Sequence, residues 1–115
     1  MPFCFQLGGA MKQGSDATLV MKKTLCVSTT LDEKTYFCNV LRYDAKQECI
    51  YLVLENDLLP AISLDAIYEC TMGETENQVL CTGRIKERYQ NKFGKILKFE
   101  IENGFYKISL KSVDK

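Results

Sequence analysis

The side chains best suited to chemistry in this sequence form a short basic row in its second half. In the run 82–89 (TGRIKERY), the two-residue period of a β-strand predicts that Arg84, Lys86 and Arg88 lie on one face. A neighbouring antiparallel strand would bring Lys98 close to them. Clustered guanidinium and ammonium groups suit phosphate, because each offers several hydrogen-bond donors. The row therefore predicts a site for a nucleotide or another anion, and the alternative is an ordinary solvated strand face.

Acid–base and metal chemistry lack their usual residues. The sequence contains no histidine, which excludes Ser-His-Asp and Cys-His catalysis and histidine-containing zinc sites within this chain. The carboxylates are scattered, and no glycine-rich phosphate loop is present. We therefore predict no catalytic residue, no metal site and no cofactor. A carbohydrate-related enzyme or accessory domain stays open as an alternative, although the missing acid–base set argues against it.

The cysteines read as structural thiols rather than as disulfides or a zinc site. No Cys-x-x-Cys spacing occurs, and no apolar leader opens the sequence. Five of the six cysteines fall in runs that resemble strands, where cysteine packs as a small hydrophobe. We therefore expect reduced thiols and a cytoplasmic location. These five residues are Cys26, Cys38, Cys49, Cys70 and Cys81.

Charge and length narrow the possible partners. Fifteen basic residues balance fifteen acidic ones, so no bulk field attracts nucleic acid, which is not an expected partner. No apolar stretch approaches the roughly 18 residues of a membrane-spanning helix, so we expect no membrane insertion. A chain of 115 residues suits one domain. We expect a flexible N-terminal segment over residues 1–16 and a single domain over residues 17–115.

The end of the sequence predicts an antiparallel meander of strands. Apolar and polar residues alternate in the runs 95–101 and 105–110, and Asn103-Gly104 separates the two runs. Asn-Gly between alternating runs is a strong hairpin signal, because a type I′ turn needs positive φ at both central residues. A turn at this point pairs Ile101 with Tyr106, Phe99 with Ile108 and Leu97 with Leu110. It also places Glu100 and Lys98 on the opposite, polar face, across from Lys107 and Ser109.

Further strand signals precede the meander. The patterns predict strands over 18–30, 35–43, 48–54, 66–72 and 78–89. The run 18–30 is either one long strand or two strands with a break near Lys22-Lys23. The segment 55–65 lacks a two-residue period and contains Pro60, so we expect a long loop with at most one helical turn near 57–64. Its residues Leu58, Leu59 and Ile62 would cover an open end of a barrel. The predicted fold is all-β, a small antiparallel barrel of six or seven strands.

The order of these segments resembles a known family. The linker 58–70 (LLPAISLDAIYEC), the run 80–88 (LCTGRIKER) and the final hairpin resemble the split β-barrel of PilZ-type proteins over residues 18–113. They are most similar to the amino-terminal barrel of bacterial flagellar-brake proteins. The resemblance implies a bacterial cytoplasmic module for regulation or interaction.

The sequence also departs from the cyclic di-GMP-binding members of that family. Those members use Arg-x-x-x-Arg and a downstream Asp/Asn-x-Ser-x-x-Gly. Arg84 and Arg88 have the first spacing, but they lie in a predicted strand rather than in a linker. The second motif is absent from the sequence.

These observations lead to a functional hypothesis with an alternative. We expect a non-catalytic binding or regulatory module whose partner is another protein or a second copy of this chain. The alternative is a nucleotide or other anionic ligand bound by Arg84, Lys86, Arg88 and Lys98.

Overall fold

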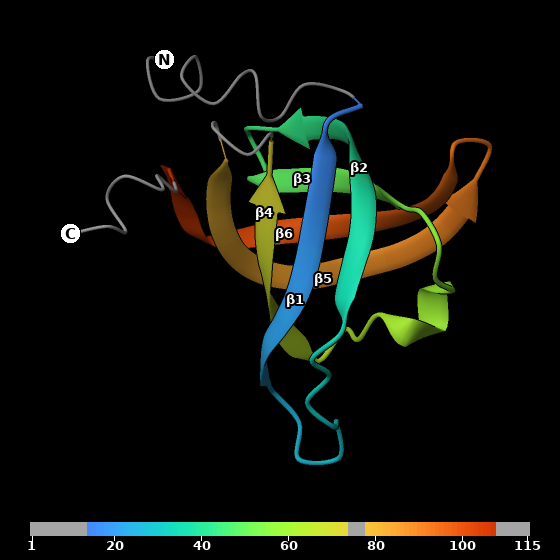
Figure 1. Ribbon diagram of the computed structural model, residues 1–115, viewed down its shortest axis with the longest axis vertical. Helices are drawn as coiled ribbons and strands as arrows, with labels where there is room; N and C mark the ends of the chain where they lie inside the picture. Colours follow the sequence, from blue (N-terminus) through green and yellow to red (C-terminus); the bar gives the residue numbers. More distant parts are fainter. Residues whose placement is uncertain (1–13, 74–77, 108–115) are drawn as a thin grey trace.

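The protein forms a closed antiparallel β-barrel, which confirms the predicted fold class (Figure 1). The computed structural model describes residues 14–73 and 78–107. The strands close in the order β1-β2-β3-β6-β5-β4. The elements are β1 (Asp16–Thr24), β2 (Thr35–Asp44), β3 (Cys49–Leu54), the short 3-10 helix η1 (Leu59–Ala61), β4 (Ala66–Met72), β5 (Val79–Asn91) and β6 (Gly94–Lys107).

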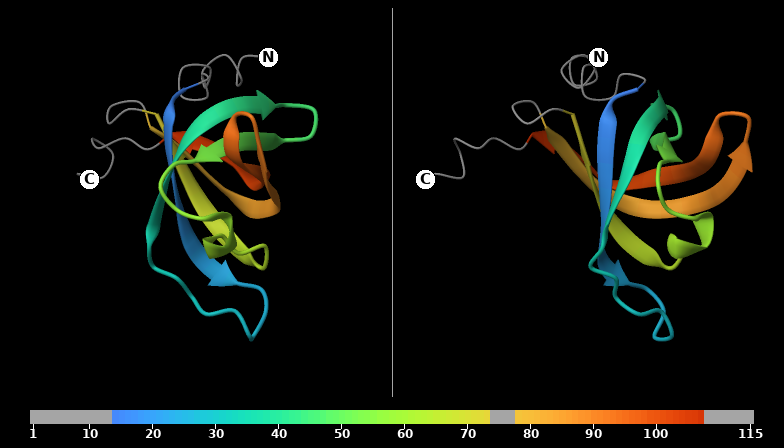
Figure 2. Two further views of the ribbon diagram at one scale, coloured as in Figure 1. Left: turned by 90° about the vertical axis from the view of Figure 1, so that its right-hand side faces the viewer. Right: turned by 45° about the vertical axis from the view of Figure 1, so that its right-hand side comes forward.

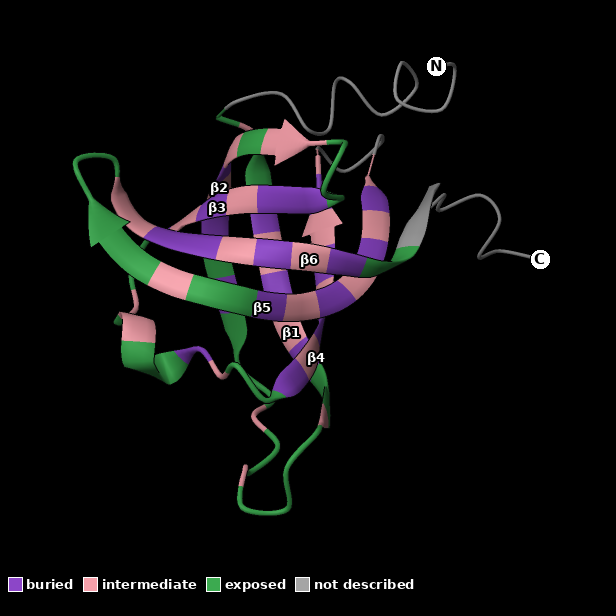
Figure 3. Cartoon of the chain, turned by 180° about the vertical axis from the view of Figure 1, so that it is seen from behind, coloured by how far each residue is buried: buried purple, intermediate pink, exposed green. Residues whose placement is uncertain are grey.

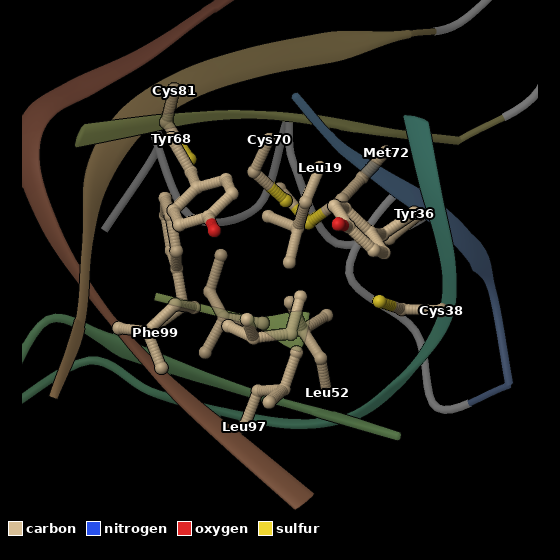
Figure 4. Packing of buried hydrophobic residues seen from close by; sticks show 14 of the residues in the cluster. Leu19, Tyr36, Cys38, Leu52, Tyr68, Cys70, Met72, Cys81, Leu97 and Phe99 are labelled. Carbon is tan, nitrogen blue, oxygen red and sulfur yellow. The ribbon is translucent and has the colours of Figure 1, made fainter. Parts of the chain in front are cut away.

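Side chains from alternating positions on the strands fill the barrel interior (Figures 3 and 4). The alternation in β2 does not decide which of its faces is buried. In the structure, Tyr36, Cys38 and Val40 point into the core. Leu97 and Phe99 on β6 are fully buried, as predicted. The polar face predicted for Lys98 and Glu100 is also confirmed, because both side chains point away from the core. Burial of these apolar surfaces is the main favourable contribution to folding.

The predicted turn at Asn103-Gly104 is wrong, because β6 runs through both residues without reversing. Phe99 pairs with Ile50 and Ile85, and Leu97 pairs with Leu52, so the expected pairs within the end of the chain do not form. Tyr106 pairs with Leu80 on β5 rather than with Ile101. The other expected partners, Ile108 and Leu110, lie outside the described residues.

The hairpin turn instead joins β5 and β6 at residues 91–94. The Phe93 backbone N–H donates to the Asn91 side-chain oxygen at 2.8 Å, which closes the turn locally. Gly94 then takes a φ of 123°, a conformation that L side chains rarely adopt. This turn and the loop that carries the 3-10 helix extend from the same side of the barrel, the right-hand side in Figure 1 and in the right-hand view of Figure 2.

Asn103-Gly104 lies instead in an irregular part of the β5–β6 ladder. Thr82 pairs with Asn103 while Gly83 pairs with Ile101, so Glu102 is an extra residue on β6. The Asn103 side-chain amide donates to the Thr82 hydroxyl at 2.9 Å across the two strands. The Asn-Gly dipeptide therefore lies at a β-bulge. The sequence of the dipeptide does not distinguish a bulge from a turn.

The first predicted strand ends earlier than expected. β1 stops at Thr24, and residues 25–34 form a loop, so the strand predicted over 18–30 is wrong beyond Thr24. Leu25 and Val27 are exposed on this loop, as is Cys26, which was expected to be buried in a strand. A register shift between Met21 and Lys23 disturbs the pairing of β1 with β4 just before the strand ends.

The loop over residues 55–65 lies at one end of the barrel, as predicted, and contains one helical turn, η1. Ile62 is fully buried in the core, and Leu59 packs against that core. Leu58 was expected to cover the barrel end as well, but it is 72% exposed. Pro60 lies inside the short helix, where its missing N–H costs little.

The predicted domain boundary lies at the start of β1. The Gly14 N–H donates to the Val40 carbonyl, and the Val40 N–H donates to the Ser15 carbonyl, at 2.8 Å in both cases. Residues 1–13 lie outside the described residues, so the flexible segment stays a prediction. Within the described ranges, no helix has the length and apolar character needed to cross a membrane.

Candidate functional site

The outer face of β3, β5 and β6 holds three of the four residues predicted to bind an anion. Arg84 and Lys98 point away from the core, because the residues on either side of each are buried. Lys86 is exposed at a bulge, where the β5–β6 register shifts between Ile85 and Glu87. These three cations therefore share one surface of the barrel.

Arg88 does not share that surface, so the predicted single row is wrong. The bulge at Lys86 inverts the alternation, and Arg88 pairs with the inward-facing Leu97 while Arg84 pairs with the outward-facing Glu100. The Arg88 guanidinium donates to the Ile62 backbone carbonyl in the loop 55–65. A bulge that adds one residue leaves no clear signal in the sequence, so simple alternation missed it.

Carboxylates accompany the cations on the outer face. The Lys86 ammonium lies 3.6 Å from the Glu100 carboxylate, and Lys98 pairs across the strands with Glu87. The pKa of Lys98 is raised: burial lowers it, but the charges of Tyr51 and Glu87 outweigh that effect. The face therefore carries compensated charge rather than a strong positive field.

Tyr51 stands at the centre of this outer face on β3. The Arg42 guanidinium carbon lies 4.1 Å from the centre of the Tyr51 ring, and the Lys98 ammonium lies 6.0 Å from it. Both distances are in the range of cation–π contacts. No pattern in the sequence links Arg42 and Tyr51 to Lys98, because only the β2–β3–β6 register brings the three residues together.

One polar atom on this face lacks a partner. The Arg84 Nε is buried and has no hydrogen-bond partner among the described residues. A buried donor without a partner costs free energy. Protein atoms cover the Arg84 Nε, so an external anion cannot reach this atom in the present arrangement.

The described cysteines are free thiols, and four of them are buried. Cys70 and Cys81 pair directly across β4 and β5, and the Cys81 thiol and burial both raise the pKa of Cys70. Over residues 14–73 and 78–107, no group of three or more Cys, Asp or Glu residues could hold a metal ion. Cys38, Cys70 and Cys81 belong to the hydrophobic cluster inside the barrel (Figure 4).

A second surface is formed by two loops, 25–34 and 55–65, which we call the loop end. Five large apolar side chains are exposed there, on loops that extend from the lower half of the barrel in Figure 1. Val27 is fully exposed and Leu58 is 72% exposed. The complete set is Leu25, Val27, Leu31, Leu58 and Leu64.

Polar contacts join these two loops to each other. The Leu25 N–H donates to the Asp65 carbonyl at 2.8 Å, and Lys34 forms an ion pair with Asp57. The Tyr36 hydroxyl donates to the Asp32 carboxylate. The loop end is therefore a defined surface, although it exposes apolar side chains.

Further contacts attach the loop 55–65 to the barrel. The Ser63 N–H donates to the hydroxyl of the buried Tyr68 at 2.9 Å. The Lys95 ammonium donates to the Asp57 carbonyl, next to the contact of Arg88 with Ile62. Leu58 and Leu64 are thus held outward while Ile62 is held inward.

Comparisons with protein families, with curated proteins and with solved structures find no match for this chain.

Proposed function

We propose that this protein is a non-catalytic interaction module that binds another protein, or a second copy of itself, through the loop end. The observation that carries this proposal is the group of five exposed apolar side chains on two anchored loops. Large exposed apolar side chains on neighbouring segments usually mark protein interfaces, and these five lie on two loops that are joined by the Leu25–Asp65 and Lys34–Asp57 contacts. Association would remove Leu58 and its neighbours from water.

The contacts beneath the patch support the same proposal. Lys34–Asp57, Tyr36–Asp32 and Ser63–Tyr68 hold the loops in place before a partner arrives. A surface that is already ordered loses less conformational entropy on association. Anchored loops are therefore better suited to binding than apolar residues on an unrestrained chain.

We further propose that the module is of the PilZ-like type, as the resemblance of residues 18–113 implies. The closed antiparallel barrel and the Arg84–Arg88 spacing support this assignment. The location of both arginines inside β5 and the absence of the second motif argue against cyclic di-GMP binding of the usual kind. A bacterial, cytoplasmic, regulatory role belongs to the same proposal.

The test compares the parent chain with a double variant, Val27→Ser/Leu58→Ser. We expect light scattering to show a mass that rises with protein concentration and changes little with salt, because apolar contacts dominate. The double variant should stay monomeric. Phe93→Ser is the matched control, since Phe93 is 55% exposed but lies on the β5–β6 turn.

If light scattering shows that the parent chain is monomeric, the next experiment tests binding to a different protein. Immobilised parent, double variant and Phe93→Ser are then compared for the proteins that they retain from a bacterial lysate. A partner retained by the parent and by Phe93→Ser, but lost from the double variant, supports the proposal. Equal retention by all three chains overturns it.

The three cations on the outer face favour a second candidate function, the binding of a nucleotide or other anion by Arg84, Lys86 and Lys98. Cyclic dinucleotides should then raise the melting temperature, and the effect should vanish in Arg84→Ala. Arg88→Ala should retain it, because Arg88 contacts Ile62 and lies on the other face. No thermal shift in the parent chain would overturn this candidate.

A further inference from the structure

A groove of about 310 Å³ lies on the outside of the barrel; it shares Glu55 with the loop end and shares no residue with the predicted anion site. It crosses β4, β1 and β2 and extends to the residue that follows β3. A volume of this size falls at the lower limit of ligand pockets, which span roughly 300–1,000 Å³. Its lining includes Asp16, Thr18, Phe37, Glu55, Thr71 and Gln78.

Phe37 supplies the groove with an open aromatic surface. The ring is 52% exposed, and the strand neighbours of Phe37 are small on this side, since Phe37 pairs with Thr18 and Thr18 pairs with Thr71. The Glu55 N–H donates to the Phe37 carbonyl at 3.0 Å, so Glu55 lies next to Phe37. An exposed phenylalanine amid short polar neighbours leaves its ring available to a ligand.

The described residues that line the groove carry negative charge. Asp16 and Glu55 are both acidic and exposed, and no basic residue lines the groove among residues 14–73 and 78–107. Within the described parts of the chain, neither carboxylate takes part in an ion pair. Burial, and then the charge of Glu55, raises the pKa of the Cys38 thiol to about 12, so this lining residue stays neutral.

We propose that this groove binds a lysine or arginine side chain of a basic peptide segment in a partner protein. A cation over the face of Phe37 gains a cation–π contact, and Asp16 and Glu55 provide the matching charge. The negative charge of the lining argues against an anionic ligand. A metal ion would bind the carboxylates and leave the exposed Phe37 ring unused, whereas a lysine or arginine side chain would use both. This site differs from the loop end, so either one can fail in experiment without the other.

The test measures binding of a fluorescein-labelled peptide of alternating lysine and glycine by fluorescence anisotropy. The full chain should bind this peptide and should not bind the same peptide with acetylated lysines. Phe37→Ala should weaken binding roughly 3- to 10-fold, whereas Phe37→Trp should preserve or strengthen it. Glu55→Gln should weaken binding roughly two- to fivefold.

Two matched variants control for general effects of the substitutions. Phe93→Ala removes another exposed aromatic ring, and Glu33→Gln neutralises another exposed carboxylate; both should bind like the parent chain. Equal weakening by these controls, or no binding by the parent, would overturn the proposal. Thermal melts that match the parent would show that Phe37→Ala is folded.

A further variant tests whether the chain occupies its own groove. Residues 1–13 include Lys12, which precedes β1 in the sequence. Lys12→Gln in the full chain should leave peptide affinity unchanged. A gain of threefold or more would identify this chain's own segment as the occupant and overturn the proposal of a partner.

Discussion

Tyr36 and Asp32 show how one buried side chain organises an exposed loop. Tyr36 is in the core, but its hydroxyl donates to Asp32 and lies 3.4 Å from the Ala61 carbonyl oxygen. The hydrogen bond from Tyr36 and the backbone N–H of Lys34 lower the pKa of Asp32. One residue therefore connects β2 to both loops of the loop end.

Stability should depend on pH through this pair. A carboxyl with a lowered folded-state pKa stabilises the fold above its unfolded pKa of 3.8, and that stability is lost as pH falls through the folded value. The difference in urea midpoint between the parent and Tyr36→Phe should therefore be larger at pH 7 than at pH 2.5. A difference that is the same at both pH values would contradict the prediction.

The described cysteines should differ in reactivity. Cys26 is exposed, and the hydrogen bond from the Ser28 hydroxyl lowers its pKa, whereas burial raises the pKa of Cys38 and Cys49. Because the thiolate is the reactive form, iodoacetamide at pH 8 should modify Cys26 first among these residues. Peptide mass mapping over time measures this order. Earlier labelling of Cys38 or Cys49 would show that the barrel opens faster than expected.

Phe99 is the residue whose truncation should damage the core most clearly. It is fully buried and pairs with Ile50 and Ile85. Phe99→Ala should lower the free energy of unfolding by about 3–5 kcal/mol in urea denaturation. Phe93→Ala, at an exposed ring, should change it by no more than about 0.5 kcal/mol. Similar losses of unfolding free energy in the two variants would mean that Phe99 does not face the core.

At the scale of elements, the long β5–β6 hairpin both closes the barrel and holds a loop. Beyond the bulge at Lys86, its inner side supplies Arg88 and Lys95 to backbone carbonyls of the loop 55–65. At Gly83 the two strands approach so closely that a Cβ would lie 1.9 Å from the Glu100 carbonyl oxygen. Local irregularities of this hairpin therefore decide which surface each cation reaches.

The loop 55–65 should loosen when the hairpin no longer holds it. In Arg88→Ala, amide hydrogen exchange within residues 55–65 should accelerate, while exchange in β1 and β4 should change little. Lys86→Ala is the control, because Lys86 contacts Glu100 on the outer face. Equal exchange of the loop in both variants would exclude a holding role for Arg88.

At the scale of the whole molecule, strands far apart in sequence close the barrel. β1 pairs with β4, and β3 pairs with β6, so the ends of long chain segments must meet before these ladders form. Closure also leaves the candidate surfaces outside: the loop end at one end, and the groove and the cationic face on the outer wall.

Folding should be slow for a chain of this size. Because the β1–β4 and β3–β6 ladders join distant residues, we expect a folding time in stopped-flow fluorescence of roughly milliseconds to seconds. Tyrosine fluorescence can report the reaction, since the chain has six tyrosines and no tryptophan. Complete folding within microseconds would contradict the observed topology.

The sequence alone determined much of the barrel. Local sequence patterns placed β2 and β3 within one residue of their observed ends and β4 at its observed bounds. They also identified Leu97 and Phe99 as core residues. A two-residue period shows which side chains share one face of a strand, and neighbouring residues in the sequence are enough to reveal it.

Only the tertiary structure decided which strands pair and where their registers shift. The turn moved from Asn103-Gly104 to residues 91–94, because β6 gains more from pairing along both β3 and β5 than from folding back on itself. The bulge at Lys86 then separated Arg88 from Arg84 and Lys98. Cross-strand partners are chosen by packing over the closed sheet, and a single extra residue reverses every later side chain, so no local pattern contains this information.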